Sequence, residues 1–200
     1  MLKHIGKLGL AVAALAAFPG MAWAHPGHDA AVGFSHGFIH PVTGLDHILA
    51  MIAVGMFAAN LGGRALWAVP LTFVGVMAIG GALGMAGIAV PMVEVGIAAS
   101  VIILGLMVTL RWKAPVTAAM ALVGVFAIFH GHAHGAEMPV DASGLHYALG
   151  FILATTLLHV VGIGFGLGVA RLGQRTAPRL VQACGLAMAV CGVGLLTGIA

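Results

Sequence analysis

Charged residues are scarce in this chain of 200 residues. Only 6% of the residues are Asp, Glu, Lys or Arg, whereas soluble domains carry roughly 25%. Hydrophobic residues make up 62%, so the composition argues against a soluble enzyme. Eight Lys and Arg against five Asp and Glu give a net charge of +3, too little and too scattered for the surface of a nucleic-acid-binding protein.

Cysteine is also scarce, and no phosphate-binding loop is present. Cys184 and Cys191 lie seven residues apart in one apolar run, about 10 Å along a helix, so they cannot form a disulfide and we expect them to pack. No Gly-x4-Gly-Lys-Ser/Thr motif occurs, which leaves nucleotide hydrolysis without its usual site. What is abundant is glycine (31), methionine (11) and histidine (11), and small residues suit closely packed membrane helices.

The first 24 residues have the pattern of a secretory signal peptide. Lys3 and Lys7 precede an apolar stretch of eleven residues, 8–18, which is too short to span a bilayer. Pro19 and Gly20 end that stretch, and Ala-Trp-Ala at 22–24 has the small-x-small form of a cleavage site. We expect cleavage there, with an uncleaved anchor helix as the alternative. Residues 25–200 would then form the mature domain.

Breaks in the apolar sequence divide the mature chain into six expected membrane spans. The predicted class is an all-α membrane protein, and three spans plus three would allow an inverted repeat. The expected segments are a first span at 35–59, two spans within 65–110 joined near 87–91, a fourth from 114 to about 130, a polar loop at 132–143, a fifth span at 144–170 and a sixth at 180–200.

The basic residues give these spans an orientation. With the mature amino terminus outside, the loops after spans one, three and five face the cytoplasm. These loops hold every Lys and Arg of the mature chain: Arg64, Arg111, Lys113, Arg171, Arg175 and Arg179. The acidic residues Asp29, Glu137 and Asp141 fall outside. This distribution follows the positive-inside rule and predicts a multi-pass protein of the bacterial inner membrane with both mature termini outside.

Ionisable side chains inside a bilayer are costly and commonly mark an ion pathway. The expected spans place Asp46, His47 and His159 near the midplane. The other candidates lie toward the outer surface: His36, His40, Glu94, His130, His132, His134, Glu137 and His146. Imidazole and carboxylate together suit Ni, Zn, Fe and Cu(II), whereas the absence of Cys from this cluster argues against a Cu(I) thiolate site.

The spacing adds detail and leaves alternatives. On one continuous helix, His36, His40 and His47 would fall within roughly 40° of one face, although Pro41 and Gly44 could break that helix and expose carbonyl oxygens. His130, His134 and Glu137 would share a face if their helix continues that far. His146 and His159 could instead form hydrogen bonds between helices, Glu94 could be a helix-start residue, and 130–137 could be a solvated loop.

The predicted mature amino terminus offers a further metal ligand. Cleavage would leave His25 first, and a free amine plus an imidazole can chelate a divalent ion. Pro26 has no amide proton, so the copper and nickel chelate that uses successive backbone nitrogens cannot form. We interpret His25 to Asp29 as a capture arm.

Two motifs resemble those of a known family. His40-Pro-Val-Thr-Gly-Leu-Asp46-His47 is similar to HPxxGxDH, and Phe129-His-Gly-His-Ala-His-Gly-Ala-Glu137 to FHGHxHGxE, the signatures of the HupE/UreJ family of nickel permeases. The resemblance extends over the whole chain. It implies secondary uptake of Ni²⁺, sometimes Co²⁺, for hydrogenase or urease assembly. By position it implies roles for His36, His40, Asp46, His47, His130, His134 and Glu137.

The predicted function is therefore import of a divalent transition metal, without enzymatic activity and without a permanently bound cofactor. Partners are the transported ion and the lipid bilayer; the sequence specifies no oligomer. The outer ligands would collect the ion, and Asp46 with His47 would complete its binding. Imidazole must be neutral to bind a metal, so uptake should weaken as pH falls through about 6.5. The alternatives are a metal sensor or assembly factor, and a b-type cytochrome with His146 and His159 as axial ligands.

Overall fold

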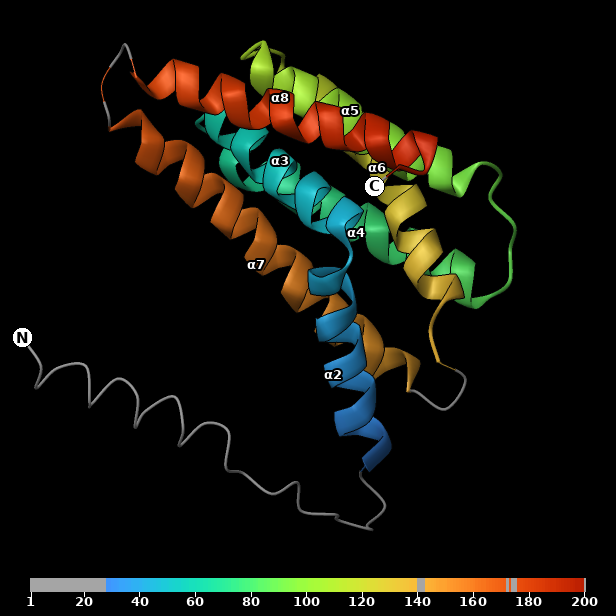
Figure 1. The fold of residues 1–200 in the computed structure, drawn as a ribbon. Helices are drawn as coiled ribbons and strands as arrows, with labels where there is room; N and C mark the ends of the chain where they lie inside the picture. The colour runs from blue at the N-terminus through green and yellow to red at the C-terminus, as the bar shows by residue number, and fades with distance from the viewer. Residues whose placement is uncertain (1–27, 140–142, 172, 174–175, 200) are drawn as a thin grey trace, which may run out of the picture.

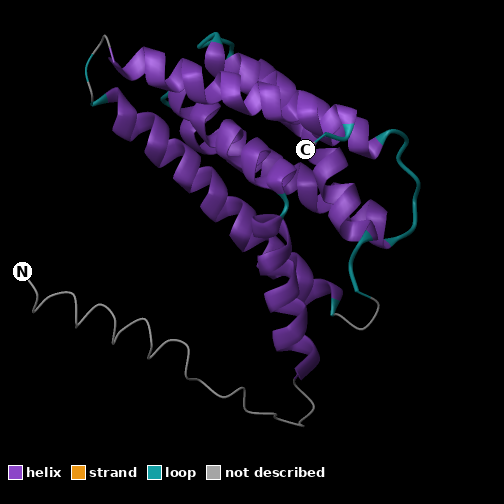
Figure 2. Cartoon of the chain, in the orientation of Figure 1, coloured by secondary structure: helices purple, strands orange, loops and turns teal. Residues whose placement is uncertain are grey.

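The structure, a computed structural model, describes residues 28–139, 143–171, 173 and 176–199. Every regular element in this part of the chain is a helix (Figure 2), which confirms the predicted all-α class. The helices are α2 (His28–Thr43), α3 (Leu45–Leu61), α4 (Ala65–Met85), α5 (Val93–Thr109), α6 (Val116–Ala136), α7 (Gly144–Ala170) and α8 (Thr176–Thr197) (Figure 1). The predicted signal peptide at 1–24 and His25 fall outside the described residues.

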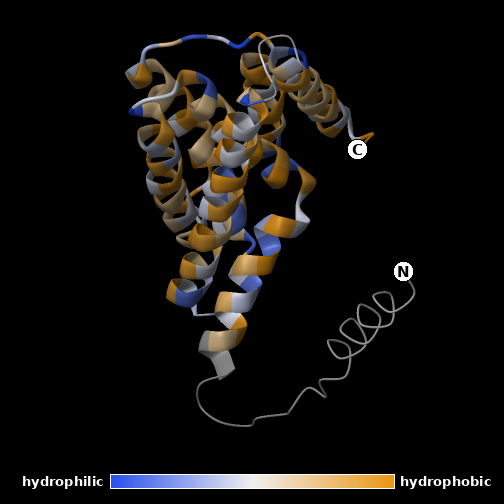
Figure 3. Cartoon of the chain, turned by 90° about the vertical axis from the view of Figure 1, so that its left-hand side faces the viewer, coloured by the Kyte–Doolittle hydropathy of each residue, from blue (hydrophilic) through white to orange (hydrophobic). Residues whose placement is uncertain are grey.

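Four helices, α4, α6, α7 and α8, are long and apolar enough to cross a membrane. The segment from Ala31 through α2 and α3 meets the same criterion as one bent span, and α5 is a shorter apolar helix of 17 residues. Hydrophobic residues predominate along the helices (Figure 3), and many of them face outward: Leu71, Ile79 and Val160 are more than half exposed. Only hydrocarbon solvates such surfaces well, so the chain is a multi-pass membrane protein.

The expected first span, 35–59, is broken in the middle. The axes of its two helices differ by 79°, and Gly44 between them is extended, with φ −81° and ψ 118°. Pro41 in the last turn of α2 lacks an amide hydrogen, and the Thr43 hydroxyl donates to the His40 carbonyl at 2.9 Å. The expectation of one continuous helix is therefore wrong, as is the shared face of His36, His40 and His47; the broken-helix alternative is confirmed.

Two other predicted boundaries are corrected. Helix α6 continues to Ala136, so His132 and His134 are helical rather than part of a polar loop at 132–143. The residues between the histidines are alanine and glycine, which are small enough for this part of α6 to pack closely on α4 as a helix. Helix α8 begins at Thr176, so Arg179 lies inside a helix rather than in the preceding loop.

Helix α7 supports both halves of the broken span. A Cβ atom added to Gly37 of α2 would collide with the Tyr147 backbone, and one added to Gly55 of α3 would lie 2.8 Å from Ile163 N and 2.9 Å from Gly162 Cα. Only glycine permits such close approach of two helix backbones. These contacts bring the buried side chains of α2 and α3 against the same face of α7.

The two ends of the bundle differ in charge. At one end Asn60 Nδ2 donates to the Trp112 carbonyl at 3.0 Å and the Lys113 ammonium donates to the Asn60 carbonyl, so the loops after α3 and α5 meet. A cavity of about 480 Å³ there is lined by Asn60, Arg111 and Gly173, which adds the loop after α7. We call this the basic end. At the opposite end, the histidine end, His132 Nε2 donates to the Ile88 carbonyl at 2.7 Å.

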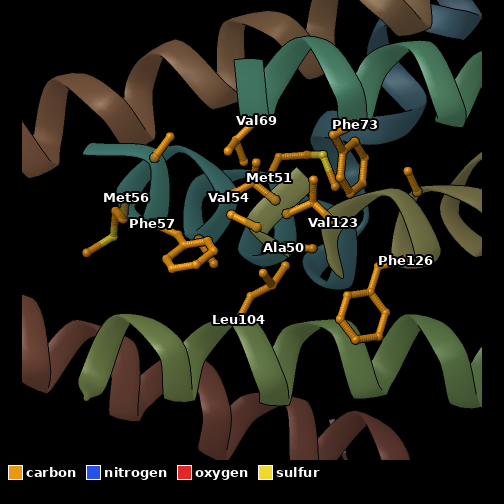
Figure 4. Close-up of a cluster of buried hydrophobic side chains, with 14 of the residues drawn as sticks. Ala50, Met51, Val54, Met56, Phe57, Val69, Phe73, Leu104, Val123 and Phe126 are labelled. Atoms are coloured by element: carbon orange, nitrogen blue, oxygen red, sulfur yellow. The ribbon is translucent and has the colours of Figure 1, made fainter. Parts of the chain in front are cut away.

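An apolar core fills the bundle between these ends. Met51, Val54 and Phe57 follow His47 along α3 toward the basic end, and all three are fully buried. Val69 of α4 and Leu104 of α5 close over them (Figure 4). The polar site described next therefore lies on the histidine side of a packed apolar layer.

Candidate metal-binding site

An outer cavity opens at the histidine end. Its volume is about 180 Å³, and His36, His40, Glu137 and Tyr147 line it. His36 is exposed and His40 is partly exposed. The cavity therefore leads from the surface to the first group of candidate ligands.

The first group, the outer group, consists of His40, His134 and Glu137, whose nearest ligand atoms all lie within 4.8 Å of one another. His40 Nε2 donates to Glu137 Oε2 at 3.0 Å, and His134 Nδ1 lies 3.8 Å from the same oxygen. The break at Gly44 permits this arrangement, since it directs the end of α2 toward the end of α6. A carboxylate and two imidazoles thus meet at the floor of the outer cavity.

The second group, the inner group, consists of His47, His130 and His134, with ligand atoms again within 4.8 Å. All three residues are buried. His134 Nε2 lies 3.1 Å from His47 Nδ1, and the His47 and His130 ring centroids are 5.3 Å apart. Three imidazoles from the α3 and α6 helices therefore face one another inside an apolar bundle.

Two hydroxyl groups determine which nitrogens of the inner group carry a proton. The Ser100 hydroxyl donates to the Ile97 carbonyl at 2.6 Å, so His130 Nε2, 2.8 Å from Ser100 Oγ, must donate to it. His130 Nδ1 then carries a lone pair, and no partner for it is found within the described segments. Such supporting hydrogen bonds orient metal-binding imidazoles and set their tautomer.

The same argument applies to His47. One arrangement satisfies both contacts of Thr155: its Oγ1 donates to Met77 Sδ at 3.8 Å and accepts from His47 Nε2 at 3.0 Å. His47 Nδ1 therefore has a lone pair, which accepts the hydrogen of His134 Nε2. An ion that binds His47 Nδ1 must displace this hydrogen bond.

His134 belongs to both groups, and each of its ring nitrogens faces one of them. Nδ1 points toward Glu137 of the outer group, while Nε2 is bonded to His47 of the inner group. Its ring also packs against the rings of His40, at 4.7 Å, and Phe151, at 4.6 Å. One imidazole therefore connects two potential binding positions.

Several predicted site residues lie apart from the two groups. Asp46 is half-buried and accepts a hydrogen bond from the His47 amide at 2.7 Å, so it holds the start of α3 in place. His132 is bonded to Ile88, and His146 Nδ1 lies 2.9 Å from Oγ of Ser143, the residue that precedes α7. Glu94 is exposed at the start of α5. His159 is buried near Phe73, at a ring distance of 5.3 Å.

Sequence reasoning missed the two hydroxyl residues, Ser100 and Thr155. Ser100 is an isolated polar residue within an apolar run, Thr155 is one of two adjacent threonines within another, and both are fully buried. That pattern could have indicated them, because a hydroxyl in a membrane span requires a partner. The identity of the partner histidine follows only from the packing of α5 on α6 and of α7 on α3.

The arrangement can bind a divalent transition ion. Imidazole nitrogens with one carboxylate are suitable ligands for Ni²⁺, Co²⁺, Zn²⁺ and Cu²⁺. The outer group can also replace hydration water near the surface, where Glu137 is more than half exposed. The inner group has only nitrogen ligands and is shielded from water.

Two comparisons with known proteins point to the same family. The sequence profile of the HupE / UreJ protein family matches residues 13–195. Protein HupE of Rhizobium leguminosarum bv. viciae is 48% identical over 193 residues, which cover 96% of this chain and 98% of that protein. No solved structure has significant similarity to the chain. The match over nearly the full length shows that the chain belongs to the HupE/UreJ family.

Proposed function

We propose that this protein is a secondary transporter that imports a divalent transition metal, Ni²⁺ or Co²⁺, across the bacterial inner membrane. The observation that carries the proposal is the pair of ligand groups joined by His134 inside an apolar bundle. Membership of the HupE/UreJ family supports this proposal. The family also supports a role in supplying the metal to hydrogenase or urease. Import needs no catalytic residue, which fits the expectation that the protein is not an enzyme.

The geometry suggests an order of events. The ion enters the outer cavity and exchanges water for His40, Glu137 and His134 Nδ1. Rotation of the His134 ring then breaks its bond to His47 and opens the inner group to the ion. Entry of a dication costs less beside Glu137 than among neutral rings alone, because opposite charges attract strongly where screening is poor.

The proposed topology has six spans. The four long helices, the bent α2–α3 pair and α5 together make six crossings, and α5 covers about 26 Å at 1.5 Å per residue, slightly less than a typical hydrocarbon core. The basic end would face the cytoplasm. An inward-moving dication then gains about 4.6 kcal/mol per 100 mV, inside negative. Signal-peptide cleavage, outer termini and an inverted repeat remain predictions.

Reporter fusions test the orientation. A reporter after Arg64 or Lys113 should indicate the cytoplasm, and one after Met138 the outside. A cytoplasmic signal after Met138 would contradict the six-span topology.

The cytochrome alternative finds little support in the structure. Two haems would require pairs of axial histidines at two depths. The buried histidines His47, His130 and His134 gather in one group rather than in pairs at two depths. A sensor or assembly factor remains without a specific observation in its favour.

Uptake by purified protein tests the main proposal. Radiolabelled Ni²⁺ and Co²⁺ are added outside proteoliposomes with an inside-negative potential, with and without a pH gradient. We expect saturable accumulation that empty liposomes do not show. Binding without accumulation would instead favour a sensor or assembly factor.

A further inference from the structure

His159 differs from the other buried histidines in its hydrogen bonding. It is 1% exposed, yet neither ring nitrogen has a hydrogen-bond partner among the residues that the structure describes. His47, His130 and His134 each have at least one nitrogen bonded. An unpaired buried imidazole is unfavourable for folding, so its presence calls for a reason other than stability.

The position of His159 connects it to the inner group. It lies one helical turn after Thr155 on α7, on the side of the basic end, and Thr155 is bonded to His47. The Phe73 ring lies 5.3 Å from the His159 ring and 5.8 Å from the His130 ring. His159 is therefore the next buried imidazole toward the basic end, and the Phe73 ring lies close to both His159 and His130.

Beyond His159 the buried interior is apolar. The buried polar residues of the described chain are His47, Ser100, His130, His134, Thr155 and His159. Toward the basic end, α3 and α7 are in contact through Gly55 and Gly162, and Gly166 faces Ala59. The cavity lined by Asn60 and Arg111 follows. An ion that moves inward from the inner group thus meets His159 as its last buried nitrogen ligand.

We propose that His159 is an onward ligand, which receives the divalent ion from the inner group before the ion crosses to the basic end. The inference rests on the proposed transport function. A neutral imidazole always has one nitrogen with a lone pair, and that nitrogen suits the same class of ion. A single ligand binds the ion more weakly than three ligands do, so the ion can leave His159 readily. Such weak sites are required for ions to pass through a protein.

The test separates binding from passage. His159→Leu, the wild type and the control His146→Leu are purified as full chains; His146 lies on the same helix but outside both ligand groups. Equilibrium dialysis with Ni²⁺ measures affinity, proteoliposome uptake measures the maximal rate, and thermal unfolding in detergent measures the melting temperature.

We expect His159→Leu to keep the wild-type affinity of the outer and inner groups and to lose maximal uptake roughly tenfold or more, as for loss of a strong polar contact to the ion. Its melting temperature should equal or exceed that of the wild type, because leucine needs no hydrogen-bond partner. His159→Cys, which retains a metal ligand, should recover more uptake than His159→Ser.

Three results would overturn the inference: unchanged uptake in His159→Leu, a parallel loss of affinity and uptake, or equal uptake by the Cys and Ser variants. If His159→Leu does not reach the membrane, the Cys and Ser comparison at equal protein amounts decides. Failure of the wild type to accumulate either ion would contradict the transport proposal itself. That outcome differs from the three above, which concern only the His159 variants.

Discussion

The histidine half and the basic half of the bundle are built from the same helices but differ in what they bury. One half buries polar side chains, and the other buries apolar ones. The histidine half contains the two ligand groups that share His134, and every buried polar side chain of the described residues except His159. The basic half contains Met51, Val54 and Phe57 with glycine contacts between α3 and α7. The first half can bind an ion from outside, and the second half closes the path behind it. In the proposed topology, this arrangement would be the outward-facing, inwardly closed state of a transporter.

His134 belongs to both ligand groups, so its replacement should have the largest effect. His134→Gln removes a ligand from both groups. We expect Ni²⁺ binding to weaken by about 1–3 kcal/mol, roughly one to two decades, at each group, and uptake to be lost at micromolar metal. Position in the sequence suggests only a collecting role for this residue; the structure adds the inner one.

His132→Gln is the matched control. It lies two residues away on α6, and its Nε2 is bonded to the Ile88 carbonyl outside both groups. Equal losses in the two variants would contradict the assignment of ligands.

A smaller effect should follow from the hydroxyl that orients His47. Thr155→Val preserves the shape of the side chain but removes the acceptor of His47 Nε2, so the tautomer with a free Nδ1 is no longer favoured. We expect Ni²⁺ affinity to fall by roughly 10–100-fold, as for other groups that support metal ligands. Equilibrium dialysis measures this change.

Thr156→Val provides the control for that substitution. Its hydroxyl is exposed and donates to the Ile152 carbonyl of its own helix at 2.7 Å. Unchanged affinity in Thr155→Val would mean that Thr155 does not orient the site.

Substitutions in the basic half should change the stability of the protein rather than its affinity for Ni²⁺. Gly162→Val places a Cβ atom 3.0 Å from Gly55 Cα, and the helices must separate to admit it. Overpacking of this kind costs about 1–3 kcal/mol, which should lower the melting temperature in detergent by several degrees. Gly164→Val is the control, since a Cβ atom there meets no atom within 4 Å. Similar melting temperatures for both variants would show that the close contact is unimportant.

The smallest effect is expected from removal of residues 25–29, the predicted capture arm. Such an arm only raises the local ion concentration, so the concentration for half-maximal uptake should rise by less than about threefold, a change below 1 kcal/mol. The maximal rate should not change. A lower maximal rate would place the arm within the transport path.

The sequence by itself determined the helical class, the approximate helix positions and the basic character of one end. Apolar run length and the loops that contain Arg64, Arg111 and Lys113 are local properties, and a bilayer imposes strong constraints on both. The two motifs also indicated five residues that the structure brings into the ligand groups: His40, His47, His130, His134 and Glu137.

Only the tertiary structure decided how these residues combine. The angle at Gly44 and the close glycine contacts with α7 depend on backbone packing between segments more than 90 residues apart, which spacing along one helix cannot express. The same packing leaves His132 and Asp46 outside the two ligand groups, makes His134 common to both, and leaves His159 without a hydrogen-bond partner among the described residues. Residue type and period predict which side chains are available, whereas contact between helices determines which of them meet.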